Sequence, residues 1–366
     1  MIFLTGFPGF LGKEMLPRLL ERDLRVKAVC LVQDRFVGQA KEALVQLSKK
    51  FPKIDLENRV EIVVGDITDE LLGLSDQYDS WAKKVTEVYH FAAIYDLDVK
   101  RAFAYKVNVD GTQHVLDFCV QCPNLNRHHY ISTCYVSGRY DGVFTEDHLE
   151  EDQEFNNFYE ETKYLAEVLV KKAMLKGMPT TIYRPAIVTG DSKTGETQKY
   201  DGPYFILKWL MRNPMVGLLP IIGDGDKHTM NIVPRDFIID AIEALSGSED
   251  SIGKTYNLAD PNPLTISKMA DVMKKALDKF YLVKFPLPLD ADQTIWLLKK
   301  LPALTEFIGM PTKSIAYFAH PTTYDTTNAT KDLAQKGIRC PNYAEYIDNI
   351  VKFLKENPNI SSKAMV

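Results

Sequence analysis

The first half of the chain alternates short apolar runs with longer amphipathic segments. The apolar runs are bounded by polar or glycine-rich turns, and they fall at residues 1–4, 26–32, 60–66, 85–93, 128–136 and 179–186. Strands of a parallel sheet are buried on both faces, so they read as continuous apolar runs. The stretches between the runs carry apolar residues at helical spacing, most clearly at 10–20 and 160–177. This alternation predicts an α/β fold, a Rossmann-type doubly wound parallel sheet with helices on both faces.

The second half of the chain no longer alternates apolar runs with amphipathic segments. After Gly190 a polar loop leads into helical segments, which we expect around residues 203–213, 235–246, 265–279 and 343–356. We therefore predict two parts. Residues 1–200 form the sheet domain, and residues 201–366 form a smaller, mainly helical lobe with the C-terminal helices. Some later segments are expected to return to the sheet.

Composition and charge place the chain among ordinary globular proteins. Of its 366 residues 45% are hydrophobic and 25% are charged, and the net charge of -5 argues against a nucleic-acid-binding domain, which is usually basic. The five cysteines are odd in number, and Cys119 and Cys122 lie in an apparent helix without a second pair. We therefore expect neither a disulfide scaffold nor a metal site. With no signal peptide and no run of about 18 apolar residues, we expect a cytoplasmic protein without a transmembrane segment.

The loop after the first predicted strand carries three glycines at a spacing of three, Gly6, Gly9 and Gly12. A dinucleotide pyrophosphate binds backbone N–H groups at a helix N-terminus, and the loop that holds it must be tight and free of obstructing side chains. The usual dinucleotide pattern is GxGxxG, whereas this one is GxxGxxG. Because a predicted strand precedes this loop and a predicted helix follows it, we interpret residues 1–200 as an NAD(P)-binding Rossmann domain.

Tyr159 and Lys163 form a YxxxK motif at the start of a predicted helix. Residues four apart share one helix face, and a lysine ammonium near a phenol favours the phenolate and lowers the pKa of the phenol. Tyr159 could then act as a general acid or base near neutral pH. Ser132 and Thr133 stand at the end of the fifth predicted strand, at the edge where open parallel sheets bind their ligands. We therefore expect these hydroxyls and the YxxxK pair to share one site.

Taken together, these motifs resemble a known family, the extended short-chain dehydrogenase/reductases. The order and spacing agree for TGFPGFLG (5–12), GDIT (65–68), HFAA (90–93), NVDGT (108–112), ISTCYVSG (131–138), YEETK (159–163) and YRPAIVTGDSKTG (183–195). Further segments are similar to the branch of fatty acyl-CoA reductases and thioester reductases, the male sterility type of NAD-binding domain: LVQDR, GDITDELLGLS, STCYVSG, YDGPYF and the tail 320–354. The resemblance spans nearly the whole chain, more loosely from 200 to 315.

The resemblance implies roles for individual residues. Tyr159 would be the proton donor, Lys163 its activator and a ribose ligand, and Thr133 the hydroxyl that holds the substrate oxygen, with Ser132 as the alternative. Asn108 would support this catalytic group. The adenine would lie beside Asp66 and Ile67, and the nicotinamide beside 185–188. The implied cofactor-binding residues are Thr5, Gly6, Phe7, Gly9, Phe10, Leu11, Gly12, Gln33, Arg35, Asp66, Ile67, Phe91, Ala92, Ala93, Tyr159, Lys163, Pro185, Ala186, Ile187 and Val188.

NADPH is the cofactor that the resemblance implies, with NADH as the alternative. The branch often places an arginine after the second strand, where it would bind the 2′-phosphate of NADP, but this chain has Gln33 there. Asp34 follows, and an acidic residue at this place could favour the ribose of NAD. Arg35 comes next, and a nearby arginine can accommodate a 2′-phosphate.

The function that the resemblance implies is hydride transfer to an acyl thioester, either acyl-CoA or carrier-bound, or to a long-chain aldehyde, giving an aldehyde or an alcohol. This would be a role in lipid metabolism, with the small-molecule substrate and an acyl carrier protein as partners. The alternative is another activity of the extended family: an epimerase, a dehydratase or a hydroxysteroid-type dehydrogenase. A nucleotide-binding redox sensor is a third possibility, disfavoured because Thr133, Tyr159 and Lys163 are all present.

The segment 292–309 leaves two interpretations open. It places Ile295, Leu298, Leu301 and Leu304 three apart, with Trp296 beside them. This spacing suits a lid or tunnel for an acyl chain, or a helix that lies on a membrane surface, and it also suits ordinary core packing of the second lobe.

Overall fold

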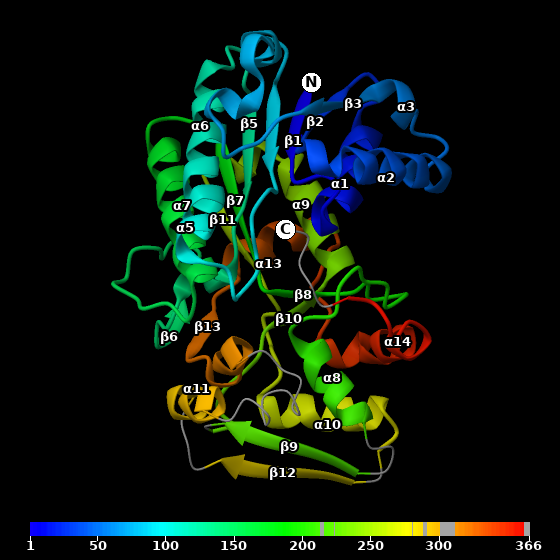
Figure 1. Cartoon of the computed structure of the whole chain (residues 1–366), viewed down its shortest axis with the longest axis vertical. Helices are drawn as coiled ribbons and strands as arrows, with labels where there is room; N and C mark the ends of the chain where they lie inside the picture. Colours follow the sequence, from blue (N-terminus) through cyan, green and yellow to red (C-terminus); the bar gives the residue numbers. More distant parts are fainter. Residues whose placement is uncertain (213–215, 223, 280, 288–290, 301–311, 362–366) are drawn as a thin grey trace.

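A seven-stranded parallel sheet is the centre of the fold (Figure 1). The computed structural model describes residues 1–361 apart from 213–215, 223, 280, 288–290 and 301–311. The strands run in the order β11-β7-β5-β4-β1-β2-β3, and every neighbouring pair is parallel. Their bounds are β1 Ile2–Thr5, β2 Ala28–Val32, β3 Val60–Val64, β4 Glu87–His90, β5 Arg127–Ile131, β7 Thr180–Pro185 and β11 Thr255–Leu258. The predicted fold class is confirmed.

Helices cover both faces of this sheet. Figure 1 shows α5, α6 and α7 along one side and α1, α2 and α9 along the other. The bounds are α1 Phe10–Arg22, α2 Val37–Lys50, α3 Leu56–Arg59, α4 Tyr78–Ala82, α5 Arg101–Tyr105, α6 Gly111–Gln121, α7 Phe158–Leu175, α9 Arg235–Ser246 and α13 Thr327–Ala334. A short π-helical stretch, Lys106–Asp110, joins α5 to α6.

Strand β1 shows why the strands read as unbroken apolar runs. Its side chains alternate between the two faces. Phe3 packs against Phe118 of α6 with ring centroids 4.6 Å apart, whereas Leu4 belongs to the core that α1 and α9 cover. Both residues are fully buried. A polar residue at either position would therefore face a core.

The second lobe lies at the end of the molecule away from the N-terminus (Figure 1). It contains α8 Pro203–Met211, α10 Ile266–Ala276, α11 Ala291–Lys300, α14 Tyr343–Glu356 and the parallel pair β9 Val216–Ile222 and β12 Tyr281–Leu287. Two further parallel pairs join the lobe to the sheet domain: β6 Gly142–Phe144 with β13 Thr322–Tyr324, and β8 Ile187–Thr189 with β10 Ile232–Pro234. The boundary at residue 200 stays a prediction. In the part of the chain that the structure describes, no helix is both long and apolar enough to cross a membrane.

Candidate active site

The glycine loop closes tightly between β1 and the end of β4. Gly6 has a φ of +83°, and a Cβ at this residue would lie 2.6 Å from the backbone nitrogen of Ala92. A Cβ at Gly9 or Gly12 would lie 2.7 Å from the carbonyl oxygen of Gly6. The turn therefore has no room for side chains at these positions. Helix α1 starts directly after Gly9, so its first N–H groups point toward the space above the loop, which suits a pyrophosphate.

Thr5 ties this loop to the segment after β4. Its hydroxyl accepts from the N–H of Ala92 at 3.2 Å, and it hydrogen-bonds Nδ1 of His90 at 2.8 Å. The structure thus brings the predicted residues of 5–12 beside the predicted residues of 91–93.

The ends of β2 and β3 bring together the residues predicted near the adenosine. Gln33 Nε2 donates to Asp66 Oδ2 at 2.7 Å, and Arg35 Nε donates to Gln33 Oε1 at 2.9 Å. The Arg35 guanidinium lies 4.7 Å from the ring centre of Phe36 and stays exposed. Ile67 is buried, and its side chain packs below Gly111 of α6, so only its backbone could line a nucleotide.

Helix α7 presents the YxxxK pair. The helix is capped by Asn157, whose side chain accepts from the N–H of Glu160 at 3.0 Å. The side chain of Tyr159 lies close to that of Thr133, at the end of β5, and this neighbour acts to lower the pKa of Tyr159. Thr133 Oγ1 donates to the carbonyl oxygen of Pro185 at 3.4 Å. The segment 185–188 therefore starts beside the two hydroxyls, and its contact with a nicotinamide stays a prediction.

The pKa of Tyr159 differs in direction from the sequence-based expectation. Burial raises it to about 12, and the neighbouring Thr133 only partly opposes this. The expected lowering of this pKa by Lys163 is therefore wrong for this structure. The reason is the direction of the ammonium, since Lys163 Nζ donates to Tyr130 Oη at 2.9 Å and to the carbonyl oxygen of Ile131 at 2.8 Å. A phenol with this pKa is protonated at neutral pH, which suits a proton donor.

Lys163 is buried, with 3% of its surface exposed. Burial lowers its pKa to about 7, while the negative charge of Glu167, one turn further along α7, acts in the opposite direction. The ammonium also lies 4.4 Å from the ring centre of Tyr130. Its protonation is thus sensitive to the groups that surround it.

Ser132 and Thr133, the two alternatives for the substrate-binding hydroxyl, have different partners. The Ser132 hydroxyl donates to Glu167 inside the protein. Glu167 also forms a buried ion pair with Arg184 of β7, at 2.6 Å. Because Ser132 is committed to this ion pair, the geometry favours Thr133 as the hydroxyl beside Tyr159.

Asn108 is a buried bridge between two segments of the site. Its side-chain oxygen accepts from the N–H of Ile94 at 2.9 Å, and its amide donates to the carbonyl oxygen of Ile94 at 3.1 Å and to Thr162 Oγ1 at 3.0 Å. Thr162 immediately precedes Lys163. Asn108 thus holds the loop after β4 against the catalytic helix, which agrees with a supporting position.

Sequence reasoning missed several residues that contact this site. Tyr130 and Glu167 hold or face Lys163, and Tyr317 from the second half of the chain hydrogen-bonds both Asn157, at 3.0 Å, and Glu160. Glu167 stands four residues after Lys163, a helical spacing that could have revealed it. Tyr130 reads as one more apolar residue of a strand, and Tyr317 gives no local signal.

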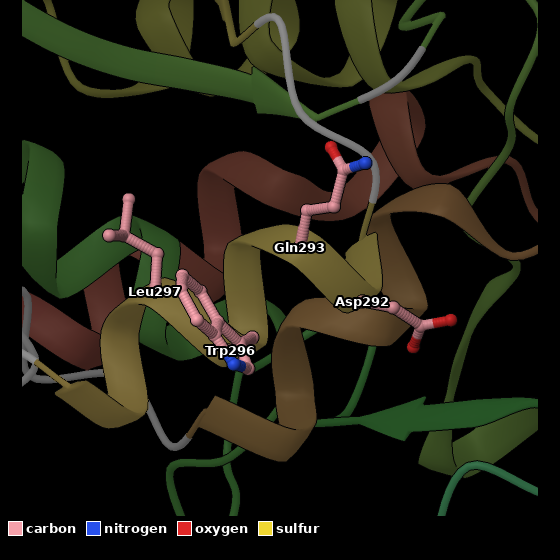
Figure 2. A pocket seen from close by; sticks show the side chains of 4 residues that line it. All are labelled: Asp292, Gln293, Trp296 and Leu297. Carbon is pink, nitrogen blue, oxygen red and sulfur yellow. The ribbon is translucent and has the colours of Figure 1, made fainter.

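A hollow of about 490 Å³ lies beside α11 and is lined, among the described residues, by Asp292, Gln293, Trp296 and Leu297. Figure 2 shows Trp296 and Leu297 close together on this helix, with Asp292 nearer its N-terminal end. Asp292 forms a two-bond ion pair with Arg139, both bonds being 2.9 Å long. Of the predicted apolar stripe, Leu301 and Leu304 and the side chains of Ile295 and Leu298 lie outside the described residues.

Arg139 connects this helix to the start of the catalytic helix. Its Nε donates to Asn156 Oδ1 at 2.9 Å, and the backbone N–H of Asn156 donates to the Glu160 carboxylate at 2.9 Å. Glu160 directly follows Tyr159. Hydrogen bonds and an ion pair therefore connect Asp292, at the apolar hollow, with Glu160, the neighbour of Tyr159 in the sequence.

The chain is similar to parts of much longer known proteins. The family model described as "Male sterility protein" matches residues 4–242. A linear gramicidin synthase of Brevibacillus parabrevis is 32% identical over 272 residues, which make up 71% of this chain and 5% of that protein. The L-2-aminoadipate reductase large subunit of Penicillium chrysogenum is 29% identical over 255 residues, 65% of this chain and 18% of that protein. The chain therefore spans less than a fifth of the length of either relative.

Solved structures give a similar result. The terminal R domain from the myxalamid PKS-NRPS biosynthetic pathway is 26% identical with a TM-score of 0.80, covering 97% of this chain and 90% of that one. A thiolation-reductase di-domain from an archaeal non-ribosomal peptide synthetase is 18% identical with a TM-score of 0.73, covering 98% of this chain and 76% of that one. At 18% identity the second likeness concerns the fold alone.

Proposed function

Because the chain belongs to the male sterility protein family of NAD-binding oxidoreductases, we propose that it is an NADPH-dependent reductase of acyl thioesters or long-chain aldehydes. The thioester would be an acyl-CoA or an acyl group on a carrier protein. The observation that carries the proposal is the pair of hydroxyls, Thr133 and Tyr159, that lie side by side at the carboxyl end of β5, with Lys163 one helical turn after Tyr159.

The proposed mechanism assigns a task to each of these groups. A bound nicotinamide would supply the hydride. Thr133 and Tyr159 donate hydrogen bonds to the carbonyl oxygen of the substrate and stabilise the negative charge that develops on it. Tyr159 Oη then gives its proton to this oxygen. Lys163, one helical turn after Tyr159, would hold the ribose of the bound cofactor.

For a thioester, the first product is a hemithioacetal. Its collapse breaks the carbon–sulfur bond, releases the thiol and leaves an aldehyde. A second reduction at the same hydroxyl pair gives an alcohol. The aldehyde therefore occupies the site in the same orientation as the thioester, with its oxygen at Thr133 and Tyr159.

The preference for NADPH is proposed from Arg35. This exposed guanidinium is held by Gln33 and lies against Phe36 at the end of β2. Asp66, an acidic side chain at the neighbouring end of β3, already accepts from Gln33 and from the N–H of Thr68 at 2.8 Å. A 2′-phosphate would meet the Arg35 guanidinium, and the exposed Asp34 of the same turn is the carboxylate that would oppose it.

Delivery on a carrier protein is supported by the kinds of protein that resemble this chain. A thiolation-reductase di-domain shares the fold, and a linear gramicidin synthase shares 32% of the residues in the matched region. The thiol released by collapse of the hemithioacetal would then be that of the carrier.

The experiment that tests the proposal follows the absorbance of NADPH and, separately, NADH. The substrates are a panel of acyl-CoAs, the same acyl groups on a carrier protein, and the matching aldehydes. Oxidation of NADPH by a thioester, with the aldehyde or alcohol identified by mass spectrometry, is the expected result. Oxidation by aldehydes alone would restrict the function to carbonyl reduction. If no substrate causes oxidation of NADPH or NADH and the protein retains NAD tightly, the proposal would be overturned in favour of an epimerase or dehydratase.

A further inference from the structure

The side chain of Lys163 is fixed before any ligand binds. Its Nζ donates to Tyr130 Oη at 2.9 Å and to the carbonyl oxygen of Ile131 at 2.8 Å, and it lies over the Tyr130 ring at 4.4 Å. Tyr130 is fully buried in the centre of β5. A lysine side chain is otherwise free to rotate about four bonds, so these contacts select one conformer.

A second set of buried hydrogen bonds starts beside Tyr130. The hydroxyl of Thr112 lies near that of Tyr130, where it opposes the rise in the pKa of the phenol, and it donates to the carbonyl oxygen of Asn108 at 2.6 Å. Thr112 Oγ1 is also 3.1 Å from Nε2 of His90, whose Nδ1 is 2.8 Å from Thr5 Oγ1. These bonds run from Thr112 to the last residue of β1, directly before the glycine loop.

The donors and acceptors in this set can be assigned in one consistent way. Burial lowers the pKa of His90, so the imidazole is neutral and carries one proton. Thr5 accepts from the N–H of Ala92 and donates to His90 Nδ1, which leaves the proton of His90 on Nε2, facing Thr112. Because Thr112 donates to a carbonyl oxygen, it must accept from His90. Lys163 donates to the Tyr130 hydroxyl, so a lone pair of this hydroxyl faces the ammonium.

The packing around Tyr130 gives no reason for a hydroxyl. Its ring lies in an apolar cluster that includes Leu116, Ala166, Val170 and Ile182. A phenylalanine would fill this space equally well, and a buried hydroxyl is unfavourable unless it is hydrogen-bonded. The hydroxyl of Tyr130 is therefore explained by its hydrogen bond with Lys163.

We propose that Tyr130 is a positioning residue for Lys163, which it holds in the conformer that serves the cofactor ribose. The inference rests on the proposed function for the role of Lys163. The other titratable groups near Lys163 are Glu167, which favours its charge, and His90, which is neutral. Tyr130 differs from both because it bonds the ammonium directly.

The test is a double-mutant cycle with Tyr130→Phe and Lys163→Met. The matched control is Tyr183→Phe, which removes a buried hydroxyl from the neighbouring strand, where it bonds His129 Nδ1 at 3.1 Å. NADPH binding is measured by fluorescence titration, and kcat and KM are measured as functions of pH. Circular dichroism and the melting temperature check that each variant is folded.

We expect Tyr130→Phe to weaken NADPH binding and to lower kcat/KM by about tenfold, the effect of losing a hydrogen bond to a charged group. Tyr130→Phe should also shift the limb of the kcat/KM pH profile that depends on Lys163. In the Lys163→Met background it should cause no further loss of NADPH binding. Tyr183→Phe should leave NADPH binding and the pH profile as in the wild type. Equal effects of Tyr130→Phe with and without Lys163 would overturn the inference, because a purely structural role acts independently of the lysine.

The outcomes also separate this inference from the proposed function. If the wild-type protein reduces no carbonyl compound, the proposed function fails, while the cycle on NADPH binding still decides whether Tyr130 acts through Lys163. If the wild type is an active reductase and the binding effects are additive, the Tyr130 inference alone is wrong.

Discussion

At the scale of single residues, the polar side chains of the candidate site differ in whether they already hydrogen-bond other groups of the protein. Ser132 donates to Glu167, and Asn108 bridges Ile94 and Thr162. Thr133 and Tyr159 remain together at the end of β5, where their hydroxyls can turn toward a substrate oxygen. The reaction is therefore expected to depend on these two hydroxyls far more than on their polar neighbours.

Replacement of the phenol tests this dependence. Tyr159→Phe should lower kcat by about 100-fold or more, since general acid catalysis contributes on that order, while NADPH still binds. The measurement is NADPH oxidation at saturating substrate, with cofactor affinity by fluorescence. Tyr164→Phe is the control, because Tyr164 lies on the same helix but packs on Phe155 with ring centroids 5.0 Å apart. A Tyr159→Phe enzyme with near-normal kcat would contradict the proposed proton donor.

Arg35 makes the cofactor preference testable at one position. Arg35→Ala should raise the KM for NADPH by about tenfold, because an exposed charged hydrogen bond to the 2′-phosphate is lost, and it should leave the KM for NADH nearly unchanged. Steady-state kinetics with both cofactors measures the effect. Arg25→Ala removes another exposed arginine, one that pairs with Asp23 at 3.1 Å, and should change neither value. An equal rise in KM for NADPH and for NADH would show that Arg35 does not recognise the 2′-phosphate.

At the scale of elements, the sequence pattern predicted those parts whose causes are local. Six sheet strands lie within the predicted apolar runs, although the edge strand β3 is only partly buried, and the glycine loop and the start of α7 carry their own signals. The seventh strand, β11 Thr255–Leu258, has the mixed sequence TYNL and was not predicted as a strand. It forms because Asn257 finds partners in the fold: its N–H donates to Glu146 at 3.0 Å and its amide to the carbonyl oxygen of Asp325 at 2.8 Å.

For the candidate site, too, the sequence predicted the features that depend on local motifs. Motif spacing places Tyr159, Lys163 and Thr133 near one another, because the carboxyl ends of parallel strands meet at one edge. Spacing cannot tell where an ammonium points. The contact between Lys163 and Tyr130 depends on the pairing of β5 with β4 and β7, which no local pattern contains.

The glycine loop is an element whose geometry excludes side chains. Gly6→Ala should destabilise the protein by about 1–3 kcal/mol, because φ is +83° and the new Cβ would lie 2.6 Å from Ala92 N, and it should weaken NADPH binding. Urea unfolding and fluorescence titration measure the two effects. Gly38→Ala is the control, since a Cβ there has no heavy atom within 4 Å and lies in helix α2. Equal stability of the two variants would mean that the loop relaxes without cost.

The ion pair between Arg139 and Asp292 links α11 to the start of α7. Asp292→Asn should raise the KM for a long-chain substrate by about twofold to fivefold, the range expected for an exposed ion pair, without changing NADPH affinity. Asp271→Asn is the control, because it breaks another ion pair of the same lobe, with Lys284 at 2.9 Å. If both variants behave alike, α11 has no particular part in substrate binding.

At the scale of the whole molecule, buried histidines couple the fold to pH. Burial lowers the pKa of His128 to about 4 and that of His320 to about 3. In the unfolded chain a histidine titrates near 6.5. The unfolded state therefore binds more protons below that pH, and the stability that is present above pH 6.5 is lost as the pH falls toward 4.

This coupling predicts the acid sensitivity of the protein. Between pH 7.5 and pH 5 each such histidine should cost about 2 kcal/mol of unfolding free energy. Over this pH range the unfolding free energy of His128→Gln should therefore fall by about 2 kcal/mol less than that of the wild type. Urea unfolding at several pH values measures the difference. His114→Gln, at a partly exposed position, should follow the wild type. Parallel curves for wild type and His128→Gln would exclude His128 as a source of acid sensitivity.

The place of β11 in the sheet has a consequence for the order in which the chain is made. Strand β7 is complete at Pro185, but the strand that covers its outer edge arrives only with residues 255–258. During translation the nascent sheet therefore carries an open edge while about 70 more residues are synthesised, at rates of roughly 5–20 residues per second. Open strand edges pair readily with other chains. For several seconds, then, the emerging protein depends on the ribosome and its chaperones. They keep the open edge of β7 from pairing with nascent chains made on the same messenger RNA.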